Sequence, residues 1–214
     1  MSYDHVLLPS GVVSTHAEAD AYLMGQQGLP ETAAVAALAA RINEADAEAG
    51  AENSFLSVDS VGGAPTGAAL HVPSPYDAIG HVRRLLFDLA TPADYAIYDP
   101  QLSWLIDPLG HVPVTVQHGG AGEFPYLTKP LAEQWVSSLM PPNPYLVVER
   151  EPQDYIQTYQ DKSGIFTLEY RDGSPDRHFG LTLRDSAMVS TLIWEWATGD
   201  RTRLNTLPWT RVDL

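Results

Sequence analysis

Apolar positions in the first half of the chain recur at strand-like and helix-like spacings. Residues 4–8, which include the apolar run Val6 to Leu8, predict a short β-strand, and residues 16–24 predict a helical segment that ends before Gly25. After Pro30, a longer helix reaching Gly50 is predicted by apolar residues at three- and four-residue spacing: Val35, Leu38, Ala39 and Ile42. The chain is therefore expected to begin with a strand followed by helices.

Two strands, a helix and a further strand are predicted next. Residues 55–61 and 68–72 flank a turn rich in glycine and proline, which predicts a β-hairpin. A helix that ends before Pro92 is predicted by the apolar stripe of Ile79, Val82, Leu85, Leu86 and Leu89. Residues 95–98 predict a buried strand, and residues 102–106 alternate as an edge strand would. This order of elements is that of the ferredoxin-like (βαββαβ) plait, an antiparallel sheet with two helices on one face.

The second half of the chain begins with a helix and continues with four strands. Thr128 is placed to cap a helix that starts near Pro130 and cannot continue into Pro141. Short turns predict an antiparallel meander of four segments: 145–150, 154–160, 165–171 and 177–183. The last helix has Asp185 as its N-cap and Gly199 just beyond its end. The predicted fold class is therefore α+β.

Two turn-rich clusters separate these halves, at residues 107–113 and 118–125. Clusters of this kind are typical of connections between compact units. The sequence therefore predicts a ferredoxin-like domain at 1–110, a linker at 111–125, and a four-stranded meander domain with flanking helices at 126–214.

Charge narrows the range of partners. The 214 residues include 27 acidic and 12 basic side chains, a net charge of −15. Residues 1–125 carry 15 acids and 3 bases, whereas residues 126–214 carry 12 acids and 9 bases, so the first domain is the acidic one. Because nucleic acids and anionic membranes are bound by clustered Lys and Arg, neither is an expected partner. A basic protein is the partner that this charge favours.

Composition places the chain among globular proteins. It is 44% hydrophobic and 18% charged, a balance that supports a packed core. It contains no cysteine, which excludes disulfides and thiol nucleophiles. The first residues lack the features of a secretory signal, and no apolar run approaches the roughly 20 residues of a membrane span. We therefore expect a cytoplasmic protein.

Motifs for catalysis are weak. The run His118-Gly119-Gly120-Ala121-Gly122 is similar to the oxyanion loop of lipases, but no serine occupies a G-x-S-x-G elbow. The seven histidines lack the spacing of a zinc site, and the sequence contains no phosphate-loop or dinucleotide fingerprint. Asp176 and His178 are close enough in sequence to suggest an acid–base pair, but no nucleophile accompanies them. We therefore predict no catalytic residue, metal or cofactor.

Aromatic residues on polar faces favour a protein-binding surface instead. On the last helix, Trp194 lies nearly opposite the apolar stripe, where it would face either the other domain or a partner. In the meander, Tyr155 and Tyr159 share one side of a strand with Gln157, and that side would suit protein contact if nothing covers it. Six residues are predicted to bind a protein: Trp194, Tyr155, Tyr159, Glu169, Arg171 and His178.

Several segments also carry a resemblance. They are Met1-Ser2-Tyr3-Asp4, Tyr98-Asp99-Pro100-Gln101, and residues 143–150, 155–158, 169–179 and 208–214. In these segments the chain resembles two-domain actinobacterial proteins of unknown function, some of which look like immunity proteins found beside toxins. The resemblance covers most of the second half and scattered points of the first. It defines no family and implies no catalytic residue.

The sequence therefore predicts a non-enzymatic cytoplasmic protein-binding module, of which an immunity or antitoxin-like inhibitor of a basic partner is one form. One alternative is a hydrolase or transferase of unknown substrate that uses His178 with Asp176, or His118, in an interdomain cleft. Another is a homo-oligomeric structural protein that pairs through a sheet edge or Trp194.

Overall fold

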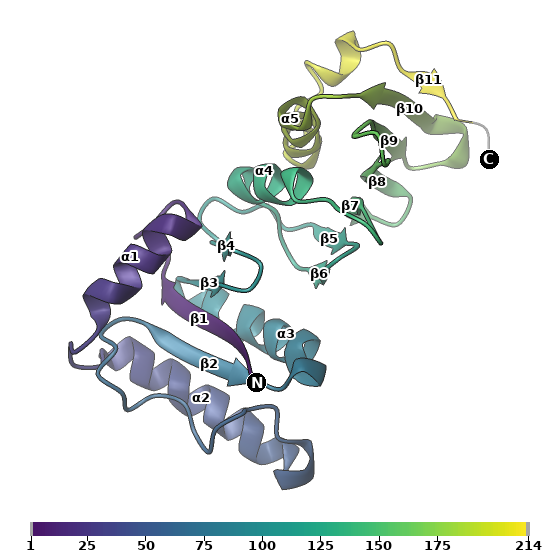
Figure 1. Cartoon of the computed structure of the whole chain (residues 1–214). Helices are drawn as coiled ribbons and strands as arrows, with labels where there is room; N and C mark the ends of the chain where they lie inside the picture. Colours follow the sequence, from purple (N-terminus) through teal and green to yellow (C-terminus); the bar gives the residue numbers. More distant parts are fainter. Residues whose placement is uncertain (1, 213–214) are drawn as a thin grey trace. The chain divides into compact units, whose positions relative to one another are not determined.

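A computed structural model describes residues 2–212 of the chain (Figure 1). Its internal contacts divide the chain into two compact units, one ending at Leu109 and the other beginning at Gly110. Each unit contains helices and its own antiparallel sheet, so the predicted α+β class is confirmed.

The first unit is built on a sheet that has four strands within the described residues, in the order β2-β1-β3-β4. Its elements are β1 (Tyr3–Pro9), α1 (His16–Gln26), α2 (Ala33–Ala49), β2 (Leu70–Ser74), α3 (Ile79–Ala90), β3 (Tyr95–Asp99) and β4 (Trp104–Ile106). All neighbouring strands pair antiparallel. Because β2 and β3 are both antiparallel to β1, which lies between them, they are parallel to each other, and α3 connects them as a split β-α-β unit.

Successive side chains of each strand point to opposite faces of this sheet, and α1 and α3 pack on different faces. On one face, Val6 and Leu8 of β1 pack with Ala19 of α1 in a buried apolar cluster. On the other face, Asp99 of β3 pairs with Arg83 of α3, which places α3 there. The ferredoxin-like plait has both helices on one face, whereas α1 and α3 lie on opposite faces here.

The predicted hairpin between residues 55–61 and 68–72 does not form, and the ferredoxin-like topology is not confirmed. Residues 55–61 contain no strand, and β2 pairs with β1 instead. The reason is that side chains of α2 bind the backbone of this segment. The Asp46 carboxylate accepts hydrogen bonds from the backbone N–H groups of Phe55 and Leu56, and Asn43 bonds to both the N–H and the C=O of Val61. These bonds, together with one from the N–H of Ser57 to the C=O of Pro73 in β2, satisfy several backbone groups of the segment without a strand ladder.

The second unit contains a larger sheet, with seven strands among the described residues in the order β11-β10-β9-β8-β7-β5-β6. The elements are β5 (Thr115–His118), β6 (Gly122–Phe124), α4 (Lys129–Ser137), β7 (Tyr145–Glu151), β8 (Asp154–Gln160), β9 (Phe166–Asp172), β10 (His178–Leu183), α5 (Ser186–Ala197) and β11 (Thr210–Arg211). The predicted four-stranded meander is confirmed as β7–β10 at the centre of this sheet.

Residues 111–125, predicted as a linker, lie within the second unit and supply two strands of its sheet. β5 pairs with β7, and β6 pairs with β5 across the turn at Gly119 and Gly120. These strands are only four and three residues long. Strands this short, joined by a glycine-rich turn, cannot be distinguished from a loop by their sequence. They become strands because β5 pairs with the distant strand β7.

Both helices of the second unit cover the same face of the sheet. Their predicted caps are confirmed: Thr128 accepts a hydrogen bond from the N–H of Leu131, and Asp185 accepts one from the N–H of Ala187. Trp135 of α4 packs against Phe124 of β6. α5 contacts β7, β8, β9 and β10 and buries its apolar stripe against these strands: Val189, Leu192, Ile193 and Trp196. The core of the unit lies between these helices and this one face.

Candidate functional site

The opposite face of the seven-stranded sheet carries side chains that no helix of this unit covers within the described residues. Successive residues of a strand point to opposite faces, so the neighbours of the buried Leu146, Val148, Ile156 and Leu168 lie on this second face. We call it the open sheet face and define it by Tyr145, Val147, Tyr155, Gln157, Tyr159, Thr167, Glu169, Arg171 and His178. Tyr145 is 39% exposed and Tyr159 is 50% exposed.

A network of polar side chains crosses this face from β8 to β10. Gln157 donates a hydrogen bond to Oε2 of Glu169 at 2.8 Å, and Nε2 of His178 lies 3.3 Å from the same oxygen. On the other side of the imidazole, Nη2 of Arg171 lies 3.4 Å from Nδ1 of His178. The strand register produces this arrangement, because Gln157 pairs with Glu169 and Arg171 pairs with His178 across neighbouring strands.

Arg171 lies at the buried end of this network, next to His178. Its Nη1 donates to Oε1 of Gln153 at 2.6 Å, and its guanidinium lies 5.4 Å from the ring centre of Tyr155. An arginine can only donate, so its contact with Nδ1 favours the His178 tautomer that carries a proton on Nε2, facing Glu169. Nε2 makes no well-aligned hydrogen bond with that carboxylate. Positive charge is therefore buried at one end of the network, and the negative charge of Glu169, 22% exposed, lies at the other.

Two shallow depressions meet on the open sheet face. The first has a volume of about 330 Å³ and is lined by residues that include Tyr145, Gln157 and Tyr159. The second, of about 410 Å³, extends over β10 toward Pro208 in the C-terminal segment. Thr167 and Glu169 line both, so the Glu169 carboxylate lies where the two depressions join.

The structure places five of the six predicted binding residues on one face of the seven-stranded sheet, where Arg171 and His178 are buried. Tyr155, Tyr159, Glu169, Arg171 and His178 lie on the open sheet face. Trp194 does not join them, because it is half-buried on α5, the helix that covers the opposite face.

Tyr145 was not predicted as a binding residue, although it lies directly opposite Tyr159 in the β7–β8 pairing. The register of this hairpin shifts at a bulge between Glu149 and Glu151, so the short turn alone would have placed Leu146 opposite Tyr159. No local signal in the sequence identifies the Tyr145–Tyr159 pair.

The residues of the enzyme alternative are not brought together. Asp176 is 86% exposed and pairs with Arg211, whereas His178 contacts Glu169 and Arg171. His118 is buried in β5, where its Nδ1 accepts a hydrogen bond from the N–H of Gly120. The Asp176–His178 pair of the enzyme alternative does not form: a 3-10 turn at Pro175–Arg177 precedes β10, and Asp176 accepts a hydrogen bond from Arg211 of β11.

The first unit holds a second polar cluster, which is buried between its sheet and α3. Arg83 and Asp99 form a buried ion pair at 3.1 Å, and the Tyr3 hydroxyl donates to Asp99 at 2.6 Å. Burial, together with this bond to Asp99, raises the pKa of Tyr3. His5 lies beside them, fully buried, with no hydrogen-bond partner for either ring nitrogen. Burial, and then the charge of Arg83, lower its pKa to about 4.

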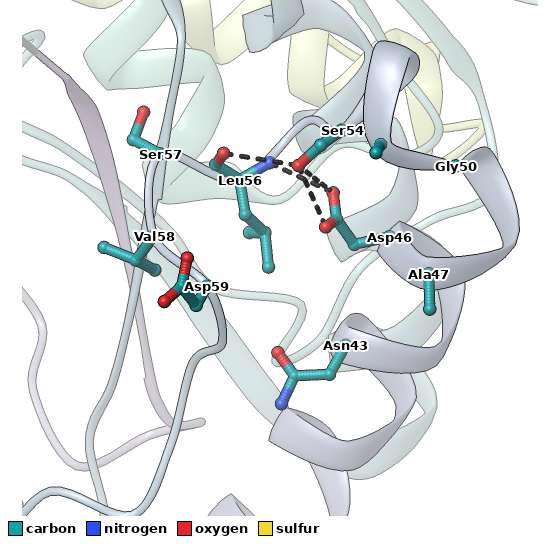
Figure 2. A pocket seen from close by; sticks show the side chains of 10 residues that line it. Asn43, Asp46, Ala47, Gly50, Ser54, Leu56, Ser57, Val58 and Asp59 are labelled. Atoms are coloured by element: carbon teal, nitrogen blue, oxygen red, sulfur yellow. Dashed lines mark hydrogen bonds between the residues drawn. The ribbon is translucent and has the colours of Figure 1, made fainter.

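A third polar feature is the depression of about 550 Å³ beside the C-terminal half of α2 (Figure 2). Figure 2 shows Asp46 pointing from the helix toward Ser54 and Leu56. The Asp46 carboxylate already accepts hydrogen bonds from the Ser54 hydroxyl and from the N–H groups of Phe55 and Leu56. This carboxylate therefore anchors the segment that follows α2, and its bonding capacity is largely used.

Residues 2–212 contain neither a metal-binding group of side chains nor a helix that could span a membrane. In this part of the chain, no group of three or more histidine and carboxylate side chains is placed to hold a metal ion. Nor does any helix there combine the length and apolar character needed to cross a bilayer. Comparison of the chain with models of protein families, with curated proteins and with solved structures finds no match, and so gives no support to the resemblance to actinobacterial proteins.

Proposed function

We propose that the protein is a protein-binding module whose contact surface is the open sheet face. One observation carries this proposal: two exposed tyrosines, Tyr145 and Tyr159, stand opposite each other beside a polar network that the strand register holds in place. Tyrosine is enriched among the residues that dominate binding energy in protein interfaces. A surface ordered before binding also loses less conformational entropy on association.

Charge favours a basic partner. Residues 1–109 contain 14 acidic and 3 basic side chains, whereas residues 110–214 contain 13 and 9. An excess of negative charge accelerates the encounter with a positively charged protein and disfavours acidic competitors. An inhibitor of the immunity or antitoxin type, acting on a basic protein, is the narrower form of this proposal.

A capture experiment tests the proposal. The immobilised protein is exposed to native lysate at about 50 mM and about 300 mM salt, because screening weakens charge-dependent association over this range. We expect a basic protein to be captured at low salt, and the double variant Tyr145→Ala/Tyr159→Ala to lose it. The matched control is Tyr76→Ala, which removes a tyrosine that is 57% exposed in the first unit. Recovery of no protein, or capture indifferent to both salt and the double variant, would contradict the proposal.

A further inference from the structure

The depression beside Tyr145 and Tyr159 has the chemistry of a subsite for a cationic side chain. Glu169 is the one charged residue among the described residues that line this depression and its neighbour over β10. The other residues that line the first depression are two tyrosines, two threonines, a glutamine and the apolar Val147. The surface therefore presents one negative charge within a largely uncharged setting.

The Glu169 carboxylate is held in position before any ligand arrives. Gln157 donates to its Oε2 at 2.8 Å, and the His178 ring lies against the same oxygen at 3.3 Å. The balancing positive charge of Arg171 lies beyond the imidazole, is buried, and lines neither depression. A ligand entering the first depression therefore meets the carboxylate and not the guanidinium.

The two tyrosines add a second feature that suits a cation. Both belong to the lining of the first depression, and both keep a large part of their surface exposed. An ammonium or guanidinium group is attracted to the face of an aromatic ring within about 6 Å of its centre. Long cationic side chains also need an apolar surface for their methylene groups, which Val147 and the ring faces supply.

We infer that this depression, bounded by Tyr145, Tyr159, Gln157 and Glu169, binds a lysine or arginine side chain of a protein partner. The inference rests on the proposed function and assigns the recognition chemistry within the open sheet face. Charge complementarity with Glu169 selects the cation, and the tyrosine rings hold its stem.

Small model compounds test the subsite without the partner. The ¹⁵N-labelled full chain is titrated with N-acetyl-arginine amide and N-acetyl-lysine amide, and with N-acetyl-norleucine amide as the neutral control of similar length. We expect the two cationic amides to shift the backbone resonances of Tyr145, Gln157, Tyr159, Thr167 and Glu169, and the norleucine amide to leave them in place. Equal shifts with the neutral compound, or shifts confined to other residues, would overturn the inference.

A matched pair of variants tests the role of the carboxylate. Glu169→Gln removes the charge in the depression, whereas Glu123→Gln removes an exposed charge on β6 that lines neither depression. We expect Glu169→Gln to weaken binding of the arginine amide about three- to tenfold, the range for a partly exposed, hydrogen-bonded ion pair. Glu123→Gln should leave binding unchanged, and equal affinity in both variants would refute the subsite. If Glu169→Gln fails to fold, Tyr159→Ala decides the question, because this exposed side chain is expected to affect binding and not folding.

The outcome for the subsite can be separated from the outcome for the proposed function. A captured partner that is lost with Tyr145→Ala/Tyr159→Ala but retained by Glu169→Gln would support the protein-binding surface and overturn the cation subsite. Saturable, Glu169-dependent binding of the arginine amide, with no protein captured from lysate, would support the subsite and contradict the proposed function.

Discussion

Each of the two sheets carries a cluster that combines an arginine, a histidine, a carboxylate and a tyrosine. The clusters differ in how far the carboxylate is exposed to solvent. In the first unit, α3 lies over the sheet, and Arg83 and Asp99 meet directly at 3.1 Å with both side chains nearly inaccessible. In the second unit, His178 stands between Arg171 and Glu169, and the carboxylate stays partly exposed. The same side-chain types are therefore sealed into a core in one case and leave a charge accessible in the other.

This difference shows how burial determines what a polar cluster can do. A buried ion pair loses its hydration, so removing one partner leaves an uncompensated charge inside the protein. A partly exposed carboxylate keeps some hydration and can exchange it for a ligand at a smaller cost. We therefore expect substitutions in the first cluster to change folding stability, and substitutions on the open sheet face to change binding.

The largest effect is expected for Asp99→Asn. This change removes the carboxylate that lies 3.1 Å from the buried Arg83 and should lower the free energy of unfolding by about 3–5 kcal/mol. Urea denaturation, followed by circular dichroism, measures the loss. The matched control is Asp176→Asn, which breaks an exposed pair with Arg211 and should change stability by less than about 1 kcal/mol. Similar losses in the two variants would show that burial does not separate the clusters.

The next effect is a pH dependence that arises from His5. Its pKa is lowered from 6.5 to about 4 in the folded protein, so between these values the unfolded chain binds a proton that the folded protein does not. Stability should therefore fall by about 3 kcal/mol in total as the pH drops through this range, and this contribution should level off once the pH lies well below the folded pKa of about 4.

Urea midpoints measured from pH 7 to pH 4 check this expectation. Replacing the histidine in His5→Leu should flatten the slope relative to the wild type. The control His71→Gln removes an exposed histidine of β2 and should keep the slope. A slope that survives in His5→Leu would assign the acid sensitivity to other groups.

A smaller effect is expected at the turn beneath Tyr145. A Cβ added to Gly119 would collide with the carbonyl oxygen of Asn143 and with the ring of Tyr145. Gly119→Ala should therefore destabilise the second unit by about 1–3 kcal/mol, a typical cost of overpacking, and should displace Tyr145. At Gly120 the added Cβ would meet only the His118 ring at ordinary contact distance, so Gly120→Ala is the matched control. Equal unfolding midpoints for the two variants would contradict this account.

The smallest effect compares two tyrosine hydroxyls directly. The buried Tyr3 hydroxyl donates to Asp99, so Tyr3→Phe should cost about 1–2 kcal/mol of stability. Tyr159 is half exposed, and Tyr159→Phe should stay within about 0.5 kcal/mol of the wild type. Thermal unfolding of both variants under one set of conditions measures the difference. If Tyr159→Phe lowered stability as much as Tyr3→Phe, the Tyr159 hydroxyl would contribute to folding, which contradicts its assignment to a binding surface.

Much of the fold could be predicted because its signals are local. The helix caps at Thr128 and Asp185 and the four strands of the meander follow from spacing and turn residues within a few positions. Residues 55–61 were mistaken for a strand because they contain β-favouring residues beside a glycine turn. Three of their backbone N–H groups bond to Asp46 and Asn43 on α2, and no local pattern reveals such partners.

For the candidate site too, local spacing predicted some contacts correctly and others not. The two-residue period of a strand placed Tyr155 and Tyr159 on one side, and the meander register extends that side to Glu169, Arg171 and His178. Spacing alone also suggested Asp176 as the partner of His178, which the turn at Pro175–Arg177 prevents.

The sequence by itself determined which residues alternate, where helices begin and end, and which half of the chain is acidic. The tertiary structure alone decided that α4 and α5 cover one face of the seven-stranded sheet, that Trp194 lies on the covering helix, and that residues 115–124 join the sheet. The physical reason is the distance along the chain over which each signal acts. Periodicity and capping depend on residues a few positions apart, and the charge of a segment depends on its own residues. Which helix packs on which face of a sheet depends on contacts between distant segments, which no local pattern records.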